Sequence, residues 1–267
     1  MANGVSQIRK SVMTLALPVT ISSLLQRSEG IVAVFLVGGL GAIPIAAVGL
    51  GQLLAFIATT LVSGLSVGTN VIVAQLWGAR RHHDAGQAAR HFLGLSIAVS
   101  LVLMASGMVL NRFAMELLGA APDVIALSLP YSTLIFLVIP FTVLLQVLSS
   151  VLQGTGDTRT PMYAMMVVNL LHIAIAYPLI YGHWGVPAFG VKGAAVAVGI
   201  AEAIGTLYLL LRCFPLLHRS KHIRYDLFRT MWQVGAPVSG ERIVQQAGIL
   251  AYTKIVLLYG TVSYAAH

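Results

Sequence analysis

The sequence from Leu15 to Val48 reads LALPVTISSLLQRSEGIVAVFLVGGLGAIPIAAV, and a related stretch returns near the end of the chain. That second stretch, residues 234–267, reads VGAPVSGERIVQQAGILAYTKIVLLYGTVSYAAH. Aligned without a gap, the two copies share an entry proline, a glutamine and an exit glycine, which are Pro18 with Pro237, Gln26 with Gln245, and Gly41 with Gly260. A long internal repeat indicates a duplicated architecture. We therefore expect the second copy to begin a second structural unit.

The composition identifies the class of protein. Of the 267 residues, 58% are hydrophobic and 9% are charged, whereas soluble domains contain about 45–50% apolar and about 25% charged residues. The mean hydropathy is +0.88, and the apolar runs are too long for the alternating pattern of a membrane barrel. The single cysteine, Cys213, excludes an internal disulfide. An all-α integral membrane protein is predicted.

Seven stretches have the length and composition of membrane-spanning helices, which need about 20 mainly apolar residues. The predicted spans are 15–38, 46–76, 92–111, 126–152, 161–182, 193–213 and 234–258. Six spans separate the starts of the two copies, and an even number returns the chain to the same side of the membrane. The copies are therefore expected to run parallel, as in transporters with two lobes related by an axis along the membrane normal.

The predicted spans divide the chain into three parts. Residues 1–213 form an amino-terminal six-helix transmembrane lobe, residues 214–233 connect the lobes on the cytoplasmic side, and residues 234–267 begin a truncated second lobe. The connection contains basic residues interleaved with apolar ones at three- and four-residue spacing. It is either an amphipathic helix in the lipid interface or a solvated basic loop.

The positions of the basic residues indicate how the chain is oriented in the membrane. A net charge of +8 would suggest nucleic acid in a soluble protein, but here the basic residues gather in the short connections. With the amino terminus in the cytoplasm, Arg112 and Lys192 are the only basic residues outside the spans that face the exterior. The positive-inside rule therefore predicts this orientation in the plasma (inner) membrane. Membrane lipid is the expected surrounding partner, and nucleic acid is not a partner.

Five short motifs occur in an order that resembles the multidrug and toxic compound extrusion (MATE) family. They are Ala74–Ala79 (AQLWGA), Gln153–Met162 (QGTGDTRTPM), Tyr177–Gly182 (YPLIYG), Gly190–Ala195 (GVKGAA) and Gly235–Pro237 (GAP) with Glu241. The resemblance covers the whole chain. It implies a twelve-helix, two-lobe antiporter, of which this chain holds the first six helices and the seventh. Lipid and polysaccharide flippases share the architecture that the resemblance implies.

Polar residues within the spans are the candidates for function, because a charged side chain in the bilayer centre costs about 2.5–3.5 kcal/mol on insertion scales. The predicted substrate- or ion-coupling residues are Gln26, Glu29, His172, Glu202, Glu241 and Gln245. No catalytic residue, metal ligand or cofactor is predicted, because the chain shows no nucleophile–base constellation and because the adjacent side chains of His82-His83-Asp84 diverge on a helix. The coupling ion is either H⁺ or Na⁺.

Glu29 is the leading candidate for coupling. The resemblance implies carboxylates at the positions of Ala33 and Ala176, where this chain has alanine. Glu29 lies one turn before Ala33 on the same helical face, so it can supply a displaced carboxylate, with help from Gln26. The alternative is a structural ion pair with a neighbour's Arg27 or with Arg242.

The other candidates each have a structural alternative. Glu202 either binds a proton or joins helices through hydrogen bonds, near Gly199 and Gly205. His172 either relays protons or forms a hydrogen bond between packed helices. Glu241 and Gln245 are four residues apart and form a polar face expected at the lobe interface.

Three functions are compatible with the sequence. The preferred function is a secondary antiporter that exports organic cations or drug-like amphiphiles in exchange for protons or sodium ions, by alternating access between two lobes. The near alternative is a flippase for a lipid-linked substrate. The third is an inactive fragment or interaction module that needs a partner supplying the remainder of the second lobe.

Alternating access needs two lobes, so purified monomeric residues 1–267 should not transport substrate. The measurement is uptake of a cationic dye into proteoliposomes under an imposed proton or sodium gradient. Gradient-driven uptake by the monomer would contradict the two-lobe hypothesis.

Overall fold

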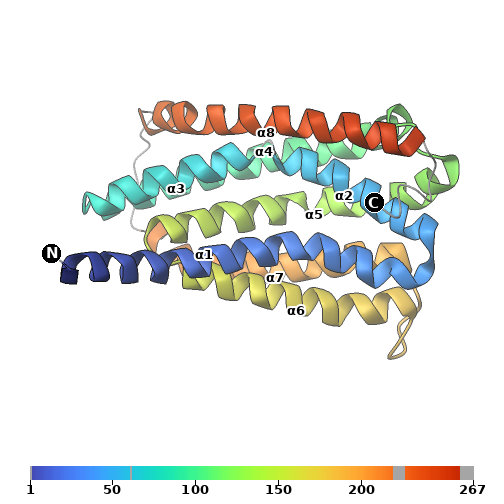
Figure 1. The fold of residues 1–267 in the computed structure, drawn as a ribbon, viewed down its shortest axis with the longest axis horizontal. Helices are drawn as coiled ribbons and strands as arrows, with labels where there is room; N and C mark the ends of the chain where they lie inside the picture. The colour runs from blue at the N-terminus through green and yellow to red at the C-terminus, as the bar shows by residue number, and fades with distance from the viewer. Residues whose placement is uncertain (1, 61, 219–225, 259–267) are drawn as a thin grey trace.

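The protein is an all-helical bundle (Figure 1). The computed structural model describes residues 2–60, 62–218 and 226–258, and no strand occurs among them. The helices are α1 (Ala2–Val37), η1 (Gly38–Leu40), α2 (Ala42–Thr60), α3 (Ser63–Gly78), α4 (His82–Leu117), α5 (Pro122–Gly154), α6 (Arg159–Tyr181), α7 (Val191–His218) and α8 (Asp226–Leu258). Within the described residues, α1, α2, α4, α5, α6 and α7 are long and apolar enough to cross a membrane. The predicted fold class is confirmed.

Helix α5 is the central element of the bundle. It packs against α2, α3, α4 and α7, while α1 lies against α6 and α6 against α7. Its buried side chains belong to all three apolar clusters of the core, with Leu148 in one, Ile139 in the second and Tyr131 in the third. A helix that is apolar on all sides is buried by its neighbours, and α5 follows this rule.

The helices are longer than the predicted spans, and the connections are correspondingly shorter. Only residues 79–81 separate α3 from α4, where the sequence predicted a connection over 77–91. The predicted connection 214–233 is also shorter, because α7 continues to His218 and α8 begins at Asp226. Residues 219–225 lie outside the described residues. The predicted interfacial helix is not a separate element over 226–233, which form the first turns of α8.

The second predicted span, 46–76, is interrupted. Helix α2 ends at Thr60, and α3 begins at Ser63. The hydroxyl of Thr60 donates to the carbonyl of Phe56 at 2.7 Å, and that of Ser63 donates to the carbonyl of Thr60 at 2.7 Å. At the break, the backbone amide of Val62 donates to the carbonyl of Thr59 at 3.0 Å, which is a turn-type bond between residues three apart.

Helix α8 lies on the outside of the bundle, mainly against α3 (Figure 1). It runs in the same direction as α1, as the repeat predicts, and the matched prolines Pro18 and Pro237 both lie inside long helices. It contains Glu241, Arg242 and Lys254 and does not belong to the six apolar helices. The seventh predicted span is thus a helix of sufficient length but of more polar composition.

Two glycines allow α3 and α8 to approach closely. A Cβ atom on Gly64 would overlap the carbonyl oxygen of Gly235 and the hydroxyl of Ser239. A Cβ atom on Gly235 would lie 2.6 Å from the carbonyl oxygen of Gly64. Small residues permit this kind of close helix packing in membranes. The contact therefore requires glycine on both helices.

Gly64→Ala should destabilise the protein by about 1–3 kcal/mol, because the added methyl group forces α3 and α8 apart. Gly240→Ala on α8 is the matched control, since nothing lies within 4 Å of its Cβ position and both changes share the higher helix propensity of alanine. Thermal unfolding can be followed by labelling the buried thiol of Cys213 with a thiol-reactive fluorophore. Equal melting temperatures for the two variants would show that the close contact contributes nothing.

Candidate functional site

Glu29 places a carboxyl group inside the bundle. It lies on α1 in the second half of the helix, and its Oε1 atom is buried without a hydrogen-bond partner. Within the described part of the chain, no basic side chain forms an ion pair with it; the ion pairs there involve Asp84 and Glu116. The predicted alternative, a pair with Arg242, is therefore not present. A buried carboxylate oxygen without a partner is energetically unfavourable, so a proton or a cation bound at Oε1 would stabilise Glu29, which as a residue is half-buried.

A hydrogen-bonded contact between α1 and α6 fixes the position of α1 next to Glu29. The side-chain amide of Asn169 donates to the carbonyl of Leu25 at 3.2 Å and to that of Met165 at 2.9 Å. The hydroxyl of Ser28 lies 3.4 Å from the Oδ1 atom of Asn169. These bonds join the two helices at the level of the carboxyl group.

A second polar pair lies on α2 and α5. The side-chain amide of Gln52 donates to the hydroxyl of Tyr131 at 3.3 Å, and Tyr131 is fully buried. A Cβ atom on Gly30 would lie 3.2 Å from the Oε1 atom of Gln52, so the glycine next to Glu29 leaves room for this amide. The Gln52–Tyr131 pair therefore lies against α1 at Gly30, the residue that follows Glu29.

Glu202 supplies a second interior carboxyl group. It lies on α7, is 4% exposed and accepts a hydrogen bond from the hydroxyl of Thr142 on α5. Helix α7 contacts α1, which carries Glu29, so two neighbouring helices each hold an interior carboxyl group. Where two carboxylates lie close together, a bound proton or cation relieves their repulsion.

His172, Ala33 and Ala176 also lie inside the bundle. His172 on α6 is 0% exposed, and neither ring nitrogen has a hydrogen-bond partner. Ala33 and Ala176 lie in one buried cluster together with Tyr131. The positions at which the resemblance implies carboxylates are thus interior, and in this chain they carry methyl groups.

The structure does not bring the remaining predicted residues into this region. Gln26 is exposed on α1, and Glu29 has no bond to it. Glu241 and Gln245 are exposed on α8. Sequence reasoning missed Gln52, Tyr131, Thr142 and Asn169. Their only sequence signal was a polar side chain within an apolar span, which many structural residues share.

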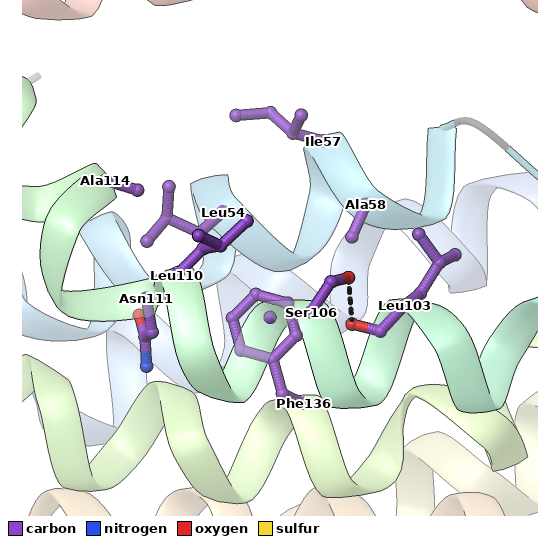
Figure 2. Close-up of a pocket in the computed structure, with 10 residues that line it drawn as sticks. Leu54, Ile57, Ala58, Leu103, Ser106, Leu110, Asn111, Ala114 and Phe136 are labelled. Atoms are coloured by element: carbon purple, nitrogen blue, oxygen red, sulfur yellow. Dashed lines mark hydrogen bonds between the residues drawn. The ribbon is translucent and has the colours of Figure 1, made fainter.

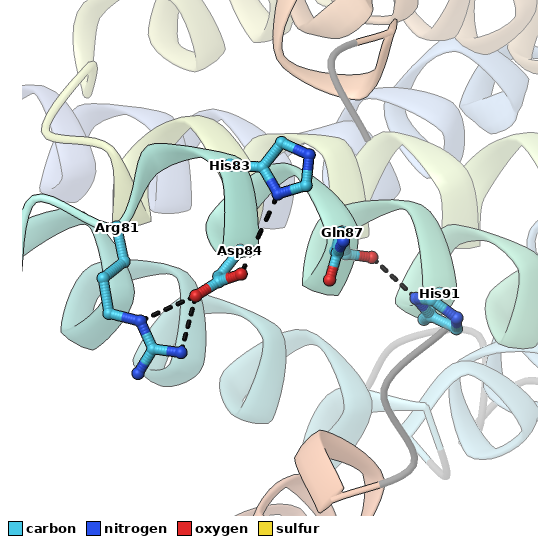
Figure 3. Close-up of polar contacts among 5 residues, drawn as sticks. All are labelled: Arg81, His83, Asp84, Gln87 and His91. Carbon is cyan, nitrogen blue, oxygen red and sulfur yellow. Dashed lines mark hydrogen bonds and ion pairs between the residues drawn. The ribbon is translucent and has the colours of Figure 1, made fainter. Parts of the chain in front are cut away.

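The His82-His83-Asp84 motif begins α4 and is held by ion pairs rather than by a metal-type arrangement (Figure 3). The side chain of Arg81 donates to Asp84 at 2.6 Å, and His83 lies 3.9 Å from the same carboxylate. The ring of His82 packs against Trp77. No group of three metal-ligating side chains occurs in the described ranges.

Comparisons with known proteins identify the family of this chain. The family model described as MatE matches residues 18–178. The chain belongs to the MatE family. MatE proteins are transporters rather than enzymes, and the apolar helices identify this member as a multi-pass membrane protein.

Two curated relatives and one solved structure illustrate the similarity of this MatE protein. It is 28% identical to the probable multidrug resistance protein YoeA of Bacillus subtilis, with 97% of this chain aligned. It is also 28% identical to the probable multidrug resistance protein NorM of Thermotoga maritima, with 98% aligned. A crystal structure of MATE in the bent conformation superposes with a TM-score of 0.82 at 24% identity over 97% of this chain. The chain spans 58% of the length of each of these three.

Thr142→Val should destabilise the protein by about 1–3 kcal/mol, because Glu202 then loses its buried hydrogen-bond donor. Thr133→Val on the same helix is the matched control, since that hydroxyl donates to Leu129 on its own helix. The difference in melting temperature between the two variants measures the bond between α5 and α7. If Thr142→Val is no more harmful than Thr133→Val, Glu202 does not depend on Thr142.

Proposed function

We propose that this chain forms the cation-binding lobe of a secondary antiporter that exports organic cations or drug-like amphiphiles. The observation that carries the proposal is the buried, unpartnered oxygen of Glu29 within a bundle of membrane-spanning helices. Ionisable residues inside membrane proteins commonly mark ion pathways. The coupling ion, a proton or Na⁺, binds at Glu29 with Glu202 as the second carboxyl group.

The proposed mechanism uses the cost of an unpaired charge in hydrocarbon. With the cation bound, Glu29 is neutralised; without it, the carboxylate is left buried and repelled by Glu202. Any conformation that solvates Glu29 is therefore favoured when the site is empty. Ion binding thus changes the relative stability of the two conformations, and this change couples the ion to alternating access.

The substrate class is proposed from the relatives and from the composition of the bundle. Several relatives carry the name "Multidrug resistance protein MdtK", and the chain aligns with 51–58% of the length of those relatives. Alternating access requires a second lobe in addition to the six apolar helices described here.

Glu29→Gln in the full gene product should abolish ion-driven export, because the neutral amide cannot exchange a cation with solvent. The measurement is dye efflux from proteoliposomes under an imposed proton or sodium gradient. The matched control is Glu116→Gln, an exposed acid at the end of α4 that pairs with Arg112 at 2.8 Å. The control should retain export.

The comparison of ions and variants decides the proposal. If Glu29→Gln loses both proton- and sodium-driven efflux while Glu116→Gln retains efflux, the coupling role of Glu29 is supported. Unchanged efflux with the same ion dependence would falsify it. Gradient-independent movement of a lipid-linked substrate, with no drug efflux by the parent protein, would instead establish the flippase alternative.

A further inference from the structure

Contacts between α1 and α6 place His172 at the level of Glu29. The side-chain amide of Asn169 on α6 donates to the carbonyl of Leu25 on α1 at 3.2 Å, and Tyr181 donates to a carbonyl in the last turn of α1 at 2.8 Å. The two helices therefore run side by side in the same direction. Glu29 follows Leu25 by four residues. His172 follows Asn169 by three, and each residue advances a helix by about 1.5 Å, so the carboxyl group and the imidazole lie within one helical turn of each other along the bundle.

Both side chains lie on the inward faces of their helices. Asn169, His172 and Ala176 are three and four residues apart, so they share one face of α6, and all three are buried. Glu29 lies one turn before Ala33 on α1, and Ala33 is buried as well. Ala33 and Ala176 belong to the same apolar cluster. Glu29 and His172 each precede an alanine of that cluster by four residues on parallel helices, so the two titratable groups lie next to each other.

Contacts between α6 and α7 bring Glu202 to the same level. The two helices run in opposite directions (Figure 1), and a Cβ atom on Gly205 of α7 would overlap the side chain of Val168 on α6. Four residues after Val168 on one helix therefore correspond to four residues before Gly205 on the other. This register places His172 opposite Ala201, the neighbour of Glu202. Two interior acids and an imidazole thus share one level of the bundle.

Glu29 and His172 differ from the surrounding titratable groups because they lack partners. Oε1 of Glu29 and both ring nitrogens of His172 are buried without a hydrogen bond. Glu202 accepts a hydrogen bond from Thr142 of α5, and Tyr131 of α5 accepts one from α2. These are the titratable side chains that α1, α7 and α5 bring to this part of α6 within the described ranges. An acid and a base that are both unsatisfied therefore lie side by side.

A proton satisfies this arrangement better than Na⁺ does. An imidazole nitrogen without a proton is an acceptor for one, and a proton needs no space of its own. A hard cation is instead bound by several oxygen ligands, and His172, which is 0% exposed, offers none. A protonated imidazole would also repel Na⁺ from the neighbouring carboxylate.

The apolar groove in Figure 2 does not supply the missing ligands. It has a volume of about 200 Å³ and lies between α2, α4 and α5. Its polar side chains, Ser106 and Asn111, belong to α4, and none of its lining residues comes from α1, α6 or α7. Glu29 and His172 therefore lie apart from this groove.

We propose that His172 is the residue that makes this lobe select protons over Na⁺. The inference rests on the coupling role proposed above for Glu29. One proton enters from solvent at Glu29, which is half-buried, and is held between its carboxyl group and the imidazole of His172. The acid and the base then carry no net charge together. The same proton leaves when the site opens to the other side of the membrane, and the unpaired carboxylate returns.

The test compares proton-driven transport with transport that needs no ion. The full gene product is reconstituted in proteoliposomes, and ¹⁴C-labelled ethidium is the cationic substrate. Efflux is measured under an imposed proton gradient and, separately, under an imposed Na⁺ gradient. Exchange of labelled for unlabelled ethidium, at equal pH and salt on both sides, reports passage of the substrate without ion coupling.

The parent protein should expel ethidium under the proton gradient and gain nothing from the Na⁺ gradient. His172→Gln and His172→Asn carry amides that cannot take up a proton. Both should reduce proton-driven efflux about tenfold, within the range typical of coupling between two sites, and leave exchange unchanged. The matched control is His183→Gln, an exposed histidine in the connection after α6, which should behave like the parent.

Three results would overturn the proposal. The first is efflux by the parent that is driven by the Na⁺ gradient, alone or alongside protons. The second is proton-driven efflux that is retained in both His172 variants. The third is an equal loss of efflux and exchange in both variants, which would indicate a purely structural role for His172.

Glu29→Gln separates this inference from the proposed function. If that variant retains ion-driven efflux, the coupling role of Glu29 is wrong and the inference fails with it. If Glu29→Gln loses ion-driven efflux while the His172 variants keep it, the coupling role stands and His172 has no part in it.

Discussion

The absence of water around the helices is the constraint on which this structure depends. Every polar group within the spans must find its partner inside the protein, because hydrocarbon offers none. Most do so locally: the hydroxyl of Thr69 donates to the carbonyl of Leu65, and that of Ser149 donates to Leu145, each at 2.7 Å. Such groups are satisfied by their own helix and need no functional explanation.

The groups that form bonds between helices have a different role. Asn169 joins α6 to α1, Gln52 joins α2 to α5, and Thr142 joins α5 to α7. Together they hold five helices around a small polar region in an otherwise apolar bundle. Glu29 and His172 stand out within that region because each has a buried atom that this network leaves unsatisfied. Unsatisfied interior groups are rare in proteins, and a bound ion is one of the explanations for them.

Length and hydropathy predicted the helical class and the six apolar helices, and the internal repeat predicted the direction of α8. The sequence also identified Glu29 and Glu202, since acids are rare within spans. It did not predict the break at Thr60, because threonine and serine within apolar runs resemble ordinary helix residues. Helical periodicity linked Glu29 to Gln26, but tertiary packing instead places Gln52 near it. Contacts between helices that are distant in sequence cannot be read from the periodicity of one helix.

The break between α2 and α3 divides the second span into segments with different neighbours. Helix α2 is packed on α5 and carries Gln52, whereas α3 is the main neighbour of α8. One membrane crossing is therefore shared between two environments: its α2 half lies beside the polar interior, and its α3 half forms most of the contact with α8.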